Sequence, residues 1–144
     1  MQESEPRHAP GSAPEQAPES TPGFALAVAA EATYLVNLML APGLAFLVLC
    51  GLWLRYRKDA PPLARCHLAQ TMAASLWAGV LLIGANALIL LIGGYDAAYT
   101  WVVLVLYFTT CHTTLIFFGA LGLARALAGR NFVYPLIGRP CEER

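Results

Sequence analysis

The third apolar block of the sequence contains an unbroken run of polar and weakly polar residues, Thr109-Thr110-Cys111-His112-Thr113-Thr114. Six such residues in succession cover every face of a helix, so some of them must face protein rather than lipid. A threonine hydroxyl can donate a hydrogen bond to a carbonyl one turn earlier, so burying threonine in a membrane helix costs little free energy. His112 is therefore the residue of this run with the strongest need for a partner.

The other two apolar blocks each hold an asparagine that could supply this partner. Counted at ~1.5 Å per residue from the predicted inner helix ends, Asn37 and Asn86 lie about 25 Å up, Thr109 about 24 Å and His112 about 20 Å. We predict an intramembrane polar cluster on three helices, formed by Asn37, Asn86, Thr109, His112 and Thr113. Three roles stay open for it: fixing helix register, handling a proton or a ligand, and contacting a partner subunit.

Two Cys-His dipeptides, Cys66-His67 and Cys111-His112, raise the question of a metal or a haem. The predicted depths separate the two histidines by ~20 Å, too far for two axial ligands of one iron. A structural zinc site needs four ligands that converge on one point. Only three candidate ligands, Cys50, Cys66 and His67, are predicted to lie at a similar depth, near the inner face. We expect no metal and no cofactor within one copy, while a haem shared with a partner protein stays an alternative.

The sequence shows no assembled catalytic motif. It contains no G-x-S-x-G, phosphate-binding loop or H-E-x-x-H pattern, and no paired intramembrane carboxylates. Glu31 and Asp96 are predicted to lie at the outer interface. The cysteines are expected to be free thiols, since Cys50 and Cys111 fall within the membrane and Cys66 and Cys141 face a reducing cytoplasm. We therefore expect no catalytic residue and no enzyme.

These residues are carried by a chain of 144 residues that is 58% hydrophobic and only 12% charged, with a mean hydropathy of +0.56. Its apolar residues form three blocks long enough to cross a bilayer. We predict an all-α integral membrane protein with three transmembrane helices. The expected parts are a disordered Pro/Glu-rich tail (1–23), a membrane domain (24–137) with spans at about 32–54, 69–92 and 100–124, and a C-terminal tail (138–144). Pro42 and Gly43 are expected to kink the first span.

The distribution of basic residues predicts the orientation. The first loop carries Arg55, Arg57, Lys58 and Arg65, and the C-terminal region carries four more arginines, whereas the second loop has none. The chain is therefore predicted to have its N-terminus outside and its C-terminus inside, in a bacterial inner membrane. The formal net charge is zero and no basic stripe exists, which argues against a nucleic-acid partner.

Small residues mark the expected helix contacts. They are Ala74 and Ala78 on the second span, and Gly119, Gly122 and Ala126 on the third.

Two stretches resemble a known family. The first is the loop Arg57-Lys58-Asp59-Ala60-Pro61-Pro62-Leu63-Ala64-Arg65-Cys66-His67-Leu68-Ala69-Gln70, and the second is the ending Ala124-Arg125-Ala126-Leu127-Ala128-Gly129-Arg130-Asn131-Phe132-Val133-Tyr134-Pro135-Leu136-Ile137. Both resemble a family of small bacterial membrane proteins of unknown function, which is similar to the small channel-like subunit of the chloroplast inner-envelope protein translocon. The resemblance covers about residues 34–137 and implies that His67, Gln70, Gly129, Tyr134 and Pro135 are motif positions.

Both motifs are predicted to lie at the inner face, with the Tyr134-Pro135 segment folding back along it. There the residues Arg55, Arg57, Lys58, Arg65, His67 and Tyr134 are expected to dock a partner or to contact phospholipid headgroups. We expect a non-catalytic accessory subunit or assembly factor of a larger membrane complex. A channel-like homo-oligomer, as the resemblance implies, and a subunit that lends a ligand to a partner's redox cofactor are the alternatives.

Overall fold

The computed structural model describes residues 17–141, and in that part of the chain every regular element is helical. A 3-10 turn (Pro18–Ser20) precedes α1 (Phe24–Met39), α2 (Leu44–Tyr56), α3 (Pro62–Gly79), the π-helical turn η2 (Val80–Gly84), α4 (Ala85–Gly93) and α5 (Ala98–Leu127). Residues 1–16 of the predicted tail and residues 142–144 lie outside the described residues.

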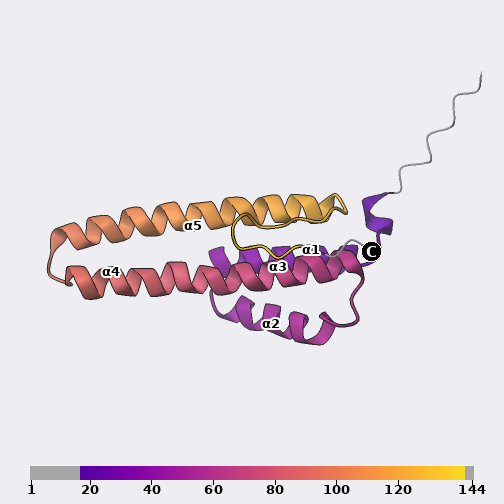
Figure 1. Cartoon of the computed structure of the whole chain (residues 1–144), viewed down its shortest axis with the longest axis horizontal. Coiled ribbons are helices and arrows are strands. Elements are labelled where there is room, and N and C mark those ends of the chain that lie inside the picture. The colour runs from indigo at the N-terminus through magenta and orange to yellow at the C-terminus, as the bar shows by residue number, and fades with distance from the viewer. Residues whose placement is uncertain (1–16, 142–144) are drawn as a thin grey trace, which may run out of the picture.

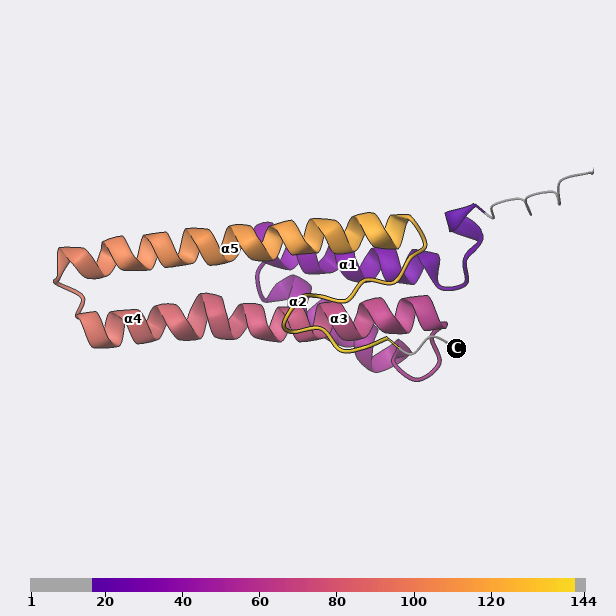
Figure 2. The same cartoon turned by 45° about the horizontal axis from the view of Figure 1, so that its top comes forward.

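Two long antiparallel helices form the frame of the molecule. The elements α3, η2 and α4 run on as one helix of 32 residues, and α5 has 30 residues; both are long and apolar enough to cross a membrane. They lie side by side over their full length (Figure 1, Figure 2). Gly94, with φ of 78°, opens the turn between them. These helices cover the second and third predicted spans and extend both toward the basic end of the molecule.

The first predicted span, 32–54, is wrong as a single helix. The region instead forms a helical hairpin in which α2 turns back alongside α1 (Figure 1). Pro42 cannot continue the amide ladder, and Gly43 takes a φ of 84° that other residues rarely adopt. The side chain of Asn37 secures the turn, because its Oδ1 accepts a hydrogen bond of 3.0 Å from the Gly43 N–H.

This reversal changes which segments of the chain lie together at one end of the molecule. Gly23, which precedes α1, lies against Ala64 and Pro61 near the start of α3, and Gly129, beyond α5, lies against Thr21 and Pro18. The predicted opposite placement of the N-terminal region and the first loop is therefore not what the structure has. We call this common end the basic end. Its exposed cations are Arg55, Arg57, Lys58, Arg65, Arg125, Arg130 and Arg139.

The hairpin packs on the long helices only over the half next to the basic end (Figure 2). Small residues allow this close packing, as the sequence predicted. Ala74 and Ala78 are buried with Tyr34, Leu38 and Leu115 in the main apolar cluster. On α5 the buried small residues are Gly119, Gly122 and Ala126.

Gly122 offers a direct test of this packing. A Cβ added there would lie 2.6 Å from Oε2 of Glu31 and 2.9 Å from the Tyr134 hydroxyl. Since both groups are buried, we expect Gly122→Ala to lower the free energy of unfolding by about 1–3 kcal/mol. Gly51→Ala on α2 is the matched control, because nothing lies within 4 Å of its added Cβ. Denaturant unfolding in detergent micelles measures both; equal stability of the two variants would contradict the packing.

After α5 the chain folds back between the long helices (Figure 1). We call residues 128–141 the C-terminal strap. Gly129, with φ of 64°, makes the reversal, and Phe132, Tyr134 and Ile137 pack against the main apolar cluster. The predicted return of the Tyr134-Pro135 segment is confirmed, but Tyr134 enters the interior and does not lie on the surface.

Candidate functional site

A carboxylate and an imidazole meet in the interior, about two helical turns from the basic end. Glu31 of α1 and His67 of α3 are both 0% exposed, and Oε1 of Glu31 lies 2.6 Å from Nδ1 of His67. Both residues lie inside apolar helices, where a polar group without a partner would be costly. The sequence places them 36 positions apart, and the α1–α2 hairpin brings them together.

The C-terminal strap supplies the remaining partners. The hydroxyl of Tyr134 donates to Oε2 of Glu31 at 2.7 Å, and the carbonyl oxygen of Arg130 lies 3.0 Å from Nε2 of His67. Burial, and then the nearby Glu31 carboxylate, raise the pKa of Tyr134, so its hydroxyl stays protonated and donates. Each carboxylate oxygen and each ring nitrogen of this buried cluster (Glu31, His67 and Tyr134) therefore has a partner.

These partners define where the protons sit. A carbonyl only accepts, so Nε2 of His67 carries a hydrogen that points to Arg130. The hydrogen between Glu31 and Nδ1 can belong to either group: a carboxylate paired with an imidazolium, or a carboxylic acid paired with a neutral imidazole. Both arrangements satisfy every partner. None of the residues of the buried cluster lines the cavity beside the strap or the cavity at the tip of the hairpin.

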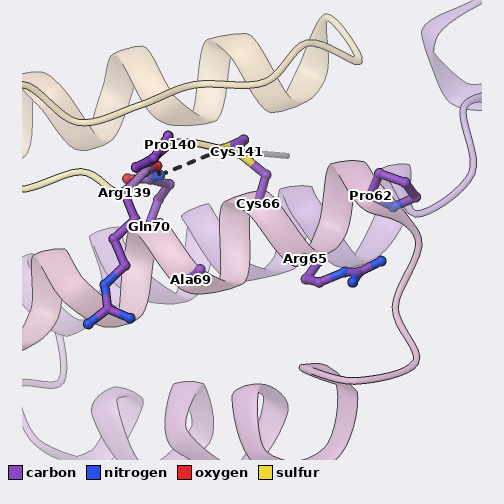
Figure 3. A pocket seen from close by; sticks show the side chains of 8 residues that line it. All are labelled: Pro62, Arg65, Cys66, Ala69, Gln70, Arg139, Pro140 and Cys141. Atoms are coloured by element: carbon purple, nitrogen blue, oxygen red, sulfur yellow. Dashed lines mark hydrogen bonds between the residues drawn. A yellow bond between two sulfur atoms is a disulfide. The ribbon is translucent and has the colours of Figure 1, made fainter. Parts of the chain in front are cut away.

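Gln70 fastens the strap one turn further along α3. Its Oε1 accepts from the Tyr134 N–H at 3.4 Å, and its Nε2 donates to the Arg139 carbonyl. Beside it Cys66 and Cys141 form a disulfide (Figure 3). The expectation that all four cysteines are free thiols is therefore wrong for this pair, because the returning strap brings Cys141 to α3. Cys50 and Cys111 are free.

A small cavity of about 220 Å³ lies between the start of α3 and the end of the strap. Arg65 and Arg139 both line it. Figure 3 shows their guanidinium groups pointing away from each other and away from the disulfide. This cavity therefore lacks convergent polar groups for a ligand.

The predicted docking residues divide into two groups. The four cations Arg55, Arg57, Lys58 and Arg65 are exposed, as a surface requires. Cζ of Arg57 lies 4.5 Å from the centroid of the Trp53 ring. The aliphatic part of Arg57 can therefore pack on this ring while the guanidinium group stays exposed. His67 and Tyr134 are buried in the cluster and cannot form part of that surface.

The predicted intramembrane polar cluster is only partly assembled. Asn37 and His112 line one cavity, and Nε2 of His112 lies 3.1 Å from the Leu38 carbonyl oxygen. Asn86 instead donates to the Leu82 carbonyl of its own helix, and Thr109 and Thr113 are exposed. The helix that carries Asn86 begins at Pro62 and not at about residue 69, so Asn86 lies about two turns further from the basic end than the depth comparison assumed.

Sequence reasoning missed Glu31 as a site residue. It was expected at the outer interface, which follows from a first span that crosses the membrane once. The signal for its true place is the combination of Pro42-Gly43 with an acid in α1 and a histidine at the start of α3, since a reversal puts both at one depth.

Within residues 17–141, no group of three or more His, Cys, Asp and Glu side chains is arranged to hold a metal ion.

Comparison with family models, with curated proteins and with solved structures gives no match to this chain. The resemblance to small bacterial membrane proteins therefore stays a prediction that rests on the two motifs. The structure gives those motifs a physical role, because His67, Gln70 and Tyr134 all belong to one network of hydrogen bonds.

Proposed function

We propose that the protein is a small non-catalytic accessory subunit of a larger membrane complex, and that α5 binds the partner. The observation that carries this proposal is the exposure of four threonines in the middle of α5, Thr109, Thr110, Thr113 and Thr114. We call them the threonine face. Thr114 donates to the Thr110 carbonyl; among the described residues the other three hydroxyls donate to nothing.

Exposed hydroxyls in an apolar helix favour association with a neighbouring helix, since lipid offers them no hydrogen bond. The α1–α2 hairpin does not reach α4 or the half of α5 that lies beside α4. There the two helices pack on each other (Figure 1). The large exposed side chains there include Leu88, Leu91, Val102, Val105 and Leu106. A partner helix along this half would cover both the threonine face and the apolar side chains.

The buried cluster supports an accessory role rather than a catalytic one. Its side-chain polar atoms all have partners within the cluster or at the Arg130 carbonyl, and it joins α1, α3 and the C-terminal strap. Such a network fixes how the hairpin sits on the long helices. His112 could lend a ligand to a partner's cofactor through Nε2 only by releasing the Leu38 carbonyl.

The proposal also includes an orientation. We place the basic end, with both ends of the described chain, at the cytoplasmic face of a bacterial inner membrane, because basic residues concentrate on that side. The seven exposed cations there would contact phospholipid headgroups. The opposite end, at residues 94–97, carries a single charge, Asp96, and an aromatic pair, Tyr95 and Trp101, with ring centroids 4.9 Å apart.

A photo-crosslinking amino acid placed at position 113 in cells tests the proposal. We expect one crosslinked product with a different, larger membrane protein, identified by mass spectrometry. The matched control carries the same probe at Leu54, which is 63% exposed on α2, away from the threonine face. A crosslink only to a second copy of the chain would favour the channel-like alternative and would overturn the accessory role. Crosslinks to lipid alone would overturn both.

A further inference from the structure

A second, larger cavity of about 460 Å³ lies at the tip of the hairpin, between the α1–α2 turn and the two long helices. Its volume falls in the range of small-molecule sites, roughly 300–1,000 Å³. Leu76 and Ile83 line it and are 54% and 74% exposed, so the cavity borders the outer surface of the long helix. A ligand would therefore enter from the surrounding lipid.

The cavity contains an unpartnered polar group. Ser75 lines it, is 5% exposed, and its hydroxyl has no hydrogen-bond partner among the described residues. A buried hydroxyl without a partner is destabilising, and a ligand oxygen that accepts its hydrogen would remove that penalty.

The cavity also offers a hydrogen-bond acceptor. His112 directs Nε2 to the Leu38 carbonyl oxygen, so that nitrogen carries the hydrogen and, in the neutral ring, Nδ1 has a free lone pair. Asn37 adds an amide N–H₂, since only its Oδ1 is used by the hairpin turn. Donors and an acceptor together suit a hydroxyl group, which both accepts and donates.

Two further features favour a ligand in this cavity, and the first favours an aromatic one. Phe46 and Phe108 line it, and Phe108 already packs edge-on to His112 with ring centroids 5.1 Å apart. The π-helical turn η2 contributes Leu82 and Ile83 to the wall, and π-turns in helices occur frequently at functional sites.

We propose that this cavity binds a neutral, membrane-soluble molecule with a phenol-type ring, whose hydroxyl accepts from Ser75 and donates to Nδ1 of His112. This site is independent of the threonine face, so either proposal can fail alone. Gly79 lines the cavity, and a Cβ there would meet nothing within 4 Å. The first atom of a side chain at this position therefore displaces no neighbour, and we expect a larger side chain there to occupy cavity space.

The test uses the full chain in phospholipid nanodiscs, with protein-free nanodiscs as the baseline. The probes are 4-hexylphenol, hexylbenzene and 1-decanol, and the readout is saturable binding above the baseline. We expect one site per chain for the phenol, with hexylbenzene about tenfold weaker because both hydrogen bonds are lost. Binding of 1-decanol as tight as that of the phenol would overturn the aromatic class.

Three variants separate the cavity from general partitioning into lipid. Gly79→Leu should abolish saturable binding, and Ser75→Ala should weaken the phenol by about threefold, for one of its two hydrogen bonds, without weakening hexylbenzene. Gly51→Leu is the matched control and should bind as wild type, since position 51 has the same open surroundings but lies outside the cavity. Non-saturable binding to wild type, or unchanged binding to a folded Gly79→Leu variant, would overturn the proposal.

Discussion

Glu31→Ala is expected to lower the free energy of unfolding by about 3–5 kcal/mol, one of the two largest effects predicted for this chain. The substitution removes the carboxylate to which both His67 and Tyr134 bond. Nδ1 of His67 and the hydroxyl of Tyr134 stay buried with nothing to bond to. The measurement is reversible unfolding in mixed micelles. Glu19→Ala is the control, because Glu19 is exposed before α1 and its loss should change stability by less than about 0.5 kcal/mol.

A double-mutant cycle tells a coupled pair from two separate effects. Glu31→Leu and His67→Phe should each destabilise strongly, and the double variant should lose less than the sum of the two, since an apolar pair of similar volume can replace a buried ion pair. Part of the loss should remain, because the Tyr134 hydroxyl and the Arg130 carbonyl keep no partner. Tyr134→Phe, which removes one bond to the carboxylate, should cost about 1.5–3 kcal/mol alone. Strictly additive losses would contradict the network seen around Glu31.

The two long helices could be predicted from the sequence because their determinants are local. Each is an apolar block longer than the bilayer needs, bounded by Pro61-Pro62, by Gly93-Gly94 or by Gly129. The motif residues His67, Gln70 and Tyr134 could also be singled out, although as a surface. Their burial depends on the C-terminal strap crossing the long helices, which no local pattern in residues 128–141 indicates.

The hairpin could not be predicted, because Pro42-Gly43 is compatible with a kink and with a reversal. What decides between them is tertiary. The reversal lets Glu31 reach His67, and it gives the Gly43 N–H a partner in Asn37. The helices on either side, at 16 and 13 residues, are each shorter than the roughly 20 residues that cross a bilayer. The predicted polar cluster is incomplete for a different reason, since the helix that carries Asn86 begins at Pro62 and not at about residue 69.

Reduction of the Cys66–Cys141 disulfide is expected to lower the free energy of unfolding by about 4 kcal/mol, the second large effect. The bond closes a loop of 75 residues, and opening it returns that freedom to the unfolded chain. It also holds the strap that carries Tyr134 and the Arg130 carbonyl against the buried cluster. Losses from Cys141→Ser and Tyr134→Phe should therefore be less than additive. Cys50→Ser, which removes a free thiol, is the matched control.

Alkylation of the denatured chain followed by mass measurement counts the paired cysteines directly. Without reductant two alkyl groups should attach, at Cys50 and Cys111, and after reduction four should attach. Four without reductant would contradict the pairing.

The same count in cells tests the orientation. A basic end in the cytoplasm predicts a mostly reduced pair that an oxidant closes, because cytosolic disulfides are chiefly transient or redox-responsive. A pair that is fully oxidised in unstressed cells would place the basic end on the oxidising side of the membrane. The orientation inferred from the basic residues would then be wrong.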